Sequence, residues 1–325
     1  MDPRDELLIQ LKNAAGWKSG EELSRQMAMT RSAVWKHIVK LREEGYNIES
    51  SPRKGYRLAD PDLIVAADVL KDLAGGLFDR PQSRFLRQTA STNLDARHLA
   101  ENGAPEGTLV VADSQDSGKG RRARKWFSPP GLGIYLSFVL RPAISPAEAA
   151  KITLLASVST AEALSELTGL QARIKWPNDI LAGGKKIAGI LAEISTELDS
   201  INYMVVGLGL NINVPLGAFP EELRGTATSV LIETGREFSR AQLLKAILRD
   251  FERRYGAARR DGFQSALKRW RELSDVIGKN IRVETAGDTV KGTVVELDRD
   301  GALVLRDSRG AVRRFLSGDI IRESR

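Results

Sequence analysis

The chain has 325 residues, a net charge of +7 and a sequence pI of about 9.6. This length predicts two or three domains, and the basicity permits a nucleic-acid partner without requiring one. The absence of cysteine excludes disulfides, thiolate metal sites and a cysteine nucleophile, and only two histidines argue against a histidine metal cluster. No signal peptide or membrane-length apolar run is visible, so we expect a cytoplasmic protein without a membrane partner.

The first sixty residues predict three helices followed by a β-hairpin. The third helix should run from Arg31 to Glu44 and end at Gly45, and short strands follow at 46–50 and 55–58. This is the pattern of a winged helix-turn-helix, whose third helix enters the DNA major groove. The alternative is a winged helix that binds another protein instead of DNA. The predicted DNA contacts are basic or polar side chains of the third helix and the hairpin tip: Arg31, Ser32, Lys36, His37, Lys40, Arg53 and Lys54.

A strand beginning at Phe85 runs into a predicted helix over 94–101. Ser91 or Thr92 can cap this helix through its hydroxyl. The helix N-terminus carries free N–H groups and a positive dipole end, which suit a polar or anionic ligand. Helix capping alone would explain these residues in most proteins.

The segment Asp113–Ser128 is a basic loop between two predicted core strands, 108–113 and 133–140. Five of the seven residues from Lys119 to Lys125 are basic, and glycines lie at 118 and 120. Glycine allows close approach to a ligand, and guanidinium groups hold phosphates and carboxylates. The loop therefore predicts a site for more than one anion, with a solvated connection or a nucleic-acid patch as the alternatives.

A second β-hairpin is predicted from strands 173–176 and 185–193, with a turn at Asn178 and Asp179. A central strand follows at 203–213. Its glycines, Gly207 and Gly209, do not form a dinucleotide fingerprint, because no third glycine and no helix follow. They predict close approach of a ligand to the sheet. From Val276 onward, short alternating strands predict a small antiparallel barrel.

Several motifs together resemble those of biotin protein ligases: STN (91–93), GKGRRARKW (118–126), KWPND (175–179), KKIAGIL (185–191) and GLGLNIN (207–213). The resemblance covers the whole chain, and the N-terminal segment is similar to that of the bifunctional members, which are also repressors. Lys119 stands where the family has arginine, and Ala123 where it has glycine. The resemblance implies an α+β multidomain fold: a winged helix-turn-helix (1–62), a central mixed-sheet ligase domain with flanking helices (63–272) and a C-terminal SH3-like β-barrel (273–325).

The resemblance also implies roles for individual residues. Arg121 and Lys186 are the implied catalytic residues, and Asp179 is an implied Mg²⁺ ligand. The implied biotin-binding residues are Ser91, Thr92, Asn93, Gln115, Lys119, Gly120, Arg121 and Lys186. The implied ATP or adenylate contacts are Gly118, Arg121, Arg124, Trp126, Asn178, Asp179 and Asn211.

The implied activity is ATP- and Mg²⁺-dependent formation of biotinyl-5′-AMP, followed by transfer of biotin to a lysine of a biotin carboxyl carrier protein. The implied second role is repression at an operator by a ligand-promoted homodimer, with biotinyl-AMP as corepressor. Three alternatives remain open: a ligand-sensing transcription factor without catalysis, a ligase that no longer binds DNA, and a lipoate ligase.

Overall fold

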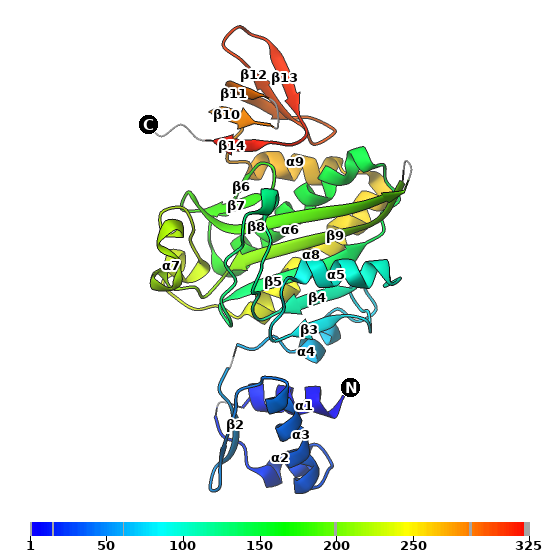
Figure 1. The fold of residues 1–325 in the computed structure, drawn as a ribbon, viewed down its shortest axis with the longest axis vertical. Coiled ribbons are helices and arrows are strands. Elements are labelled where there is room, and N and C mark those ends of the chain that lie inside the picture. The colour runs from blue at the N-terminus through cyan, green and yellow to red at the C-terminus, as the bar shows by residue number, and fades with distance from the viewer. Residues whose placement is uncertain (1, 15, 61, 198–199, 286–287, 322–325) are drawn as a thin grey trace.

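In this computed structural model, residues 2–14, 16–60, 62–197, 200–285 and 288–321 are described. They form three bodies along the long axis of the molecule (Figure 1). A winged helix lies at one end, a seven-stranded sheet with its helices in the middle, and a five-stranded sheet at the other end. The predicted fold class is confirmed. In the described part of the chain, no helix is both long and apolar enough to cross a membrane.

The winged helix has the predicted element order. Thr30 begins the third helix by accepting a hydrogen bond from the Ala33 N–H, and Ser19 caps the second helix in the same way. Apolar residues at helical spacing, such as Val34 and Ile38, are fully buried against the other helices. The elements are α1 (Pro3–Lys12), α2 (Gly20–Gln26), α3 (Arg31–Glu43), β1 (Ile48–Ser51) and β2 (Gly55–Leu58).

The central sheet is mixed, as predicted, with the order β3-β4-β5-β9-β8-β7-β6. Only the β3–β4 pair is parallel among the described strand pairs of this sheet. The strands are β3 (Arg84–Leu86), β4 (Leu109–Ala112), β5 (Gly133–Leu140), β6 (Arg173–Lys175), β7 (Asp179–Ala182), β8 (Lys185–Glu197) and β9 (Ser200–Asn211).

Helices cover the two faces of this sheet unequally (Figure 1). One face carries the main core beneath α6 (Ala149–Thr168), α8 (Arg240–Asp261) and α9 (Gln264–Leu273), whereas α5 (Thr92–Glu101) covers part of the other. Along β9, Val206, Leu208 and Leu210 belong to the main core. Because successive side chains of a strand point to opposite faces, Gly207, Gly209 and Asn211 face the less covered side. Smaller helices are α4 (Ala66–Asp72) and α7 (Val230–Thr234).

The C-terminal body is an antiparallel sheet of order β13-β12-β11-β10-β14. Its closure into an SH3-like barrel stays a prediction. Its last strand returns toward the central domain, where Gly318 lies close to Trp176. The strands are β10 (Asn280–Glu284), β11 (Thr289–Leu297), β12 (Leu303–Arg306), β13 (Val312–Phe315) and β14 (Asp319–Ile321).

Arg240, the first residue of α8, is buried between the winged-helix linker and the central sheet, with 1% of its surface exposed. Its guanidinium lies 3.0 Å from Asp62 Oδ2 and 2.6 Å from Asp113 Oδ1, and donates to the Gly133 carbonyl at 3.3 Å. Asp113 directly follows β4, and Gly133 begins β5. Arg240 therefore joins the linker to both ends of the segment that carries the basic loop.

Arg87 extends this network toward the winged helix. It lies 3.2 Å from Asp113 Oδ2 and 3.0 Å from Asp60 Oδ2, and its guanidinium stacks on the ring of Tyr46 at 5.6 Å. Leu63 and Val65, which follow the predicted boundary at residue 62, pack into the winged-helix core. The linker is therefore held by both domains. The domain boundaries themselves stay a prediction.

We expect Asp62→Asn to lower the free energy of unfolding by roughly 2 kcal/mol, since hydrogen bonds to charged groups contribute about 1.5–3 kcal/mol. The substitution leaves the buried Arg240 guanidinium without one of its two carboxylates. Chemical denaturation measures this change, and Asp261→Asn, at an exposed position, is the control. Equal stability of the two variants would contradict a structural role for this network.

Candidate active site

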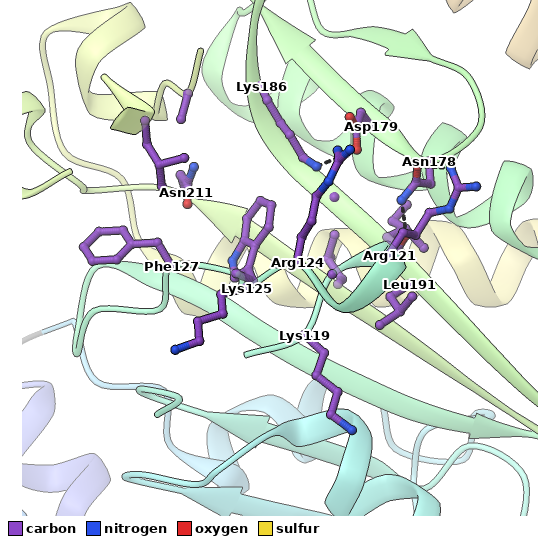
Figure 2. Close-up of a pocket in the computed structure, with 18 of the residues that line it drawn as sticks. Lys119, Arg121, Arg124, Lys125, Phe127, Asn178, Asp179, Lys186, Leu191 and Asn211 are labelled. Carbon is purple, nitrogen blue, oxygen red and sulfur yellow. Dashed lines mark hydrogen bonds and ion pairs between the residues drawn. The ribbon is translucent and has the colours of Figure 1, made fainter. Parts of the chain in front are cut away.

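A cavity of about 480 Å³ lies on the less covered side of β8 and β9, beside α5 and the basic loop. It brings together nearly all residues that the sequence predicts to bind biotin or ATP (Figure 2). These lining residues are Ser91, Thr92, Asn93, Gln115, Lys119, Gly120, Arg121, Arg124, Trp126, Asn178, Asp179, Lys186 and Asn211. Gly118 does not line the cavity. A Cβ there would lie 2.7 Å from the Trp126 carbonyl, so this glycine allows close packing within the loop instead.

The start of α5 forms a polar end of the cavity. The predicted hydroxyl cap by Ser91 or Thr92 is wrong: Ser91 holds the N-cap position, but no side-chain capping hydrogen bond forms within the described part of the chain. Gln115 Oε1 instead accepts from the Thr92 N–H at 2.9 Å and from the Thr92 hydroxyl at 3.1 Å. Gln115 thereby fixes the beginning of the basic segment to the helix N-terminus.

Asn93 is held in a defined orientation beside this end. Its Oδ1 accepts from the buried Ser137 hydroxyl at 2.6 Å, and its Nδ2 donates to Glu193 at 2.7 Å. A Cβ at Gly207 would lie only 1.9 Å from Asn93 Oδ1. Gly207 is therefore needed to accommodate Asn93, whereas the sequence predicts that it lets a ligand approach.

Trp126 lies over Gly209, the next glycine of β9. A Cβ at Gly209 would come within 2.4 Å of the indole, and one at Gly189 within 3.1 Å. The Lys186 ammonium lies 5.2 Å from the ring centroid, which is a cation–π distance. The indole thus anchors the basic loop to the sheet. Its Nε1 is buried without a hydrogen-bond partner among the described residues, so a donor is available to a bound molecule.

Positive charge gathers where the basic loop meets the β7–β8 hairpin. Lys186 Nζ lies 2.6 Å from Asp179 Oδ1, and Arg121 donates to Asn178 Oδ1 at 3.4 Å. Figure 2 shows Arg121, Arg124 and Lys186 directed toward this region, whereas Lys119 and Lys125 point away from it. Arg121, Arg124 and Lys186 therefore form the cationic end of the cavity, and Lys119 lies at its edge.

Asp319 of the C-terminal sheet faces the arginines of the loop. Its carboxylate lies 3.4 Å from Arg121, 3.0 Å from Arg122 and 3.3 Å from Arg124. Burial lowers the pKa of Arg121 and Asp319 opposes this shift, but a guanidinium remains protonated in proteins. The sequence contains no signal for this contact, because Asp319 is 195 residues from Arg124 along the chain.

The loop backbone bends sharply just after Gly120. Arg122 and Ala123 both have positive φ, +53° and +58°. This left-handed conformation costs a non-glycine residue about 1–2 kcal/mol. Hydrogen bonds from the Gly120 N–H to Arg124 and from the Trp126 N–H to Gly118 close the bend. Ala123 is thus compatible with a bend that a glycine would form more easily.

The described side chains around Asp179 do not form a complete metal site, and its role as a Mg²⁺ ligand stays a prediction. Its carboxylate is already paired with the Lys186 ammonium, and Asp319 is paired with arginines. No group of three or more potential metal ligands occurs among the described residues.

The predicted DNA-contact residues lie on the outside of the winged helix, with one exception. His37 is half-buried, and its Nδ1 is enclosed without a partner among the described residues. His37 is therefore only partly exposed on α3, and its contact with DNA stays a prediction. The exposed predicted residues are Arg31, Ser32, Lys36, Lys40, Arg53 and Lys54.

The fold and the cavity together define a winged-helix protein joined to a mixed-sheet domain, whose cavity has a polar end at α5 and a cationic end at Lys186. Residues 84–211 match the biotin/lipoate A/B protein ligase family, residues 4–57 match an HTH domain, and residues 276–322 match the biotin protein ligase C-terminal domain.

Similar proteins are found by both sequence and structure. The bifunctional ligase/repressor BirA of Bacillus subtilis is 39% identical over 96% of this chain and 97% of that protein, and its Escherichia coli counterpart is 31% identical over 96% and 95%. A solved structure of biotin protein ligase from Aquifex aeolicus in complex with biotin and ATP has a TM-score of 0.64 at 29% identity, and covers 74% of this chain and 98% of that one. The chain belongs to the biotin protein ligase family, in its bifunctional ligase/repressor branch.

Proposed function

We propose that this protein is an ATP-dependent biotin protein ligase that also represses biotin genes. In the first step, the biotin carboxylate attacks the α-phosphorus of ATP, and biotinyl-5′-AMP and pyrophosphate form. In the second step, a lysine amine of a biotin carboxyl carrier protein attacks the mixed anhydride, an amide forms and AMP leaves. Neither step requires a nucleophilic side chain of the enzyme.

The main support for this function is one continuous cavity, which has a polar end at α5 and a cationic end at Lys186. The first step brings a carboxylate to a polyphosphate, so positive charge near the reacting phosphorus is its main requirement. Lys186 and Arg121 supply this charge, and Arg124 adds to it. Positioning of both substrates in one cavity contributes much of the remaining acceleration.

An unsatisfied polar atom of Asn211 supports the nucleotide part of this proposal. Asn211 donates to the Thr228 carbonyl at 3.0 Å, and its Oδ1 is buried without a partner among the described residues. That oxygen can accept a hydrogen bond from an amino group such as that of adenine. Phe127 and Phe219, which lie 5.8 Å apart, offer apolar surface for a flat base nearby.

Exchange of labelled pyrophosphate into ATP tests the first step. We expect exchange that depends on biotin, with lipoate as the matched control acid. Exchange with lipoate alone would establish a lipoate ligase. Absence of exchange with either acid from folded protein would leave a ligand-sensing regulator without catalysis.

We expect Arg121→Gly to release the adenylate intermediate from the enzyme faster, with little effect on stability. The guanidinium reaches across the cavity to Asn178 and to the Gly318 carbonyl, so its loss opens the loop on that side. Release of radiolabelled biotinyl-AMP into a filtrate measures the effect. Lys125→Gly, whose side chain lines the cavity but points away from Arg121 and Lys186, is the control. Equal release from both variants would contradict this role.

The repressor role is supported by the exposed basic side chains of α3 and the hairpin tip on the same chain as the ligand cavity. In this proposal, the adenylate orders the basic loop, two chains associate, and their winged helices bind a two-fold operator. Analytical ultracentrifugation with and without biotin and ATP tests the association. A sedimentation coefficient that is independent of both ligands would overturn the dimer, and ligation without DNA binding would establish a ligase only.

A further inference from the structure

Trp35 is an exposed aromatic residue on the helix that the DNA-binding proposal places in the major groove. Its side chain is 55% exposed, and among the described residues of the winged helix it is the one large apolar side chain that is exposed. Sequence reasoning missed it, because an aromatic residue within a helix is usually part of the core. The core side of α3 is instead formed by Val34, Ile38 and Leu41.

The surroundings of Trp35 are cationic. Residues three and four positions apart on a helix are surface neighbours, so Ser32 and Arg31 lie next to the indole, and both are exposed. Lys36, also exposed, follows it directly. The surface thus offers a flat apolar ring with a hydroxyl and a positive charge beside it.

Trp17, the other tryptophan of this domain, is covered by basic side chains of the same chain. The ring of Trp17 carries the Arg57 guanidinium at 5.0 Å and the Lys54 ammonium at 6.0 Å. No ring contact involves Trp35 among the described residues. One exposed ring is also too small for a stable protein interface, which buries roughly 800 Å² on each partner. The exposed indole and the basic residues beside it therefore favour binding to a polyanion that presents a single apolar group.

We propose that Trp35 packs against the C5-methyl group of a thymine in the major groove and thereby contributes to operator sequence specificity. The thymine methyl is the one apolar group that a base pair presents in this groove, where apolar side chains recognise it. Trp35 is the fifth residue of α3, and N-terminal residues of a recognition helix contact base edges. This inference rests on the proposed DNA-binding function.

Uracil substitution tests the contact, because it removes the methyl group and leaves base pairing unchanged. Duplexes that the full-length protein enriches from a random library, with biotin and ATP present, would first define its preferred sequence. We then expect uracil at one thymine of each half-site to weaken binding by the wild-type protein about tenfold, or about 1.4 kcal/mol. Trp35→Ala should weaken binding to thymine DNA similarly and show no further loss with uracil.

The controls separate the possible outcomes. Trp35→Ala should retain pyrophosphate exchange, and Val312→Ala, at an equally exposed position of the C-terminal sheet, should retain both DNA binding and uracil sensitivity. If uracil weakens binding equally for Trp35→Ala and the wild-type protein, or for neither, the proposed contact of Trp35 is wrong. The DNA-binding function would be unaffected by that result. Failure of the wild-type protein to enrich any sequence would overturn the DNA-binding function, and this inference with it.

Discussion

Lys186→Gln should lower the rate of biotin-dependent pyrophosphate exchange by roughly 10²–10³, the scale for loss of one group that stabilises developing charge. The ammonium lies 2.6 Å from Asp179 and 5.2 Å from the Trp126 ring centroid, so both neighbours restrict it to the cationic end of the cavity. Glutamine keeps a hydrogen-bond donor but removes the charge. The effect should therefore be on the rate of adenylation more than on stability.

Lys185→Gln is the matched control for this experiment. Lys185 is the adjacent residue on β8 and carries the same charge, but its ammonium donates to the Arg224 carbonyl at 3.4 Å instead of approaching Asp179. Single-turnover formation of biotinyl-AMP distinguishes the two variants. Equal rates for both would contradict a specific role for Lys186.

Gly209→Ala should lower adenylation about 10²-fold, although the change adds only one methyl group. That methyl would meet the Trp126 indole at 2.4 Å, below any ordinary contact distance. The indole and the loop it anchors must then move, and a misplacement of about 1 Å at a reacting site can cost roughly 10²-fold in rate. The expected loss of stability is smaller, about 1–3 kcal/mol for overpacking.

Two variants test the cause of that loss. Gly217→Ala adds a methyl group in open space and should leave the rate unchanged. In a Trp126→Ala background, Gly209→Ala should cost little further, because the clashing ring is absent; contacting residues of this kind give non-additive effects. Full additivity of the two substitutions would refute the proposed contact.

The sequence predicts those parts of this molecule that depend on short stretches of chain. Hydrophobic periodicity and turn residues locate α3 and the wing, since each is fixed by residues close together in sequence. The predicted hairpin of strands 173–176 and 185–193 is wrong, because β7 begins at Asp179 and pairs with both β6 and β8. The five motifs are sufficient to predict most of the residues that line the cavity. Gly118 lies outside the cavity lining, and a glycine motif does not reveal whether the missing side chain makes room for a ligand or for the loop itself.

Long-range contacts are what the sequence could not provide. Asp319 meets the loop only because the C-terminal sheet folds back against the central domain, and Gly207 and Gly209 prove to accommodate Asn93 and Trp126. Gln115 likewise takes over the cap expected of Ser91. Each of these contacts is set by the packing of distant elements, so no local pattern encodes it.

The buried Arg240 network has a geometric consequence for DNA recognition. A winged helix on a loose tether could adapt to half-sites at many separations, but here Asp60 and Asp62 fix the linker to the ligase domain. In a dimer, the protein would then fix how far apart the two recognition helices lie and how they are rotated relative to each other around the DNA axis. A single base pair inserted between the half-sites would turn one of them by about 34–36° around the DNA axis, out of reach of its recognition helix.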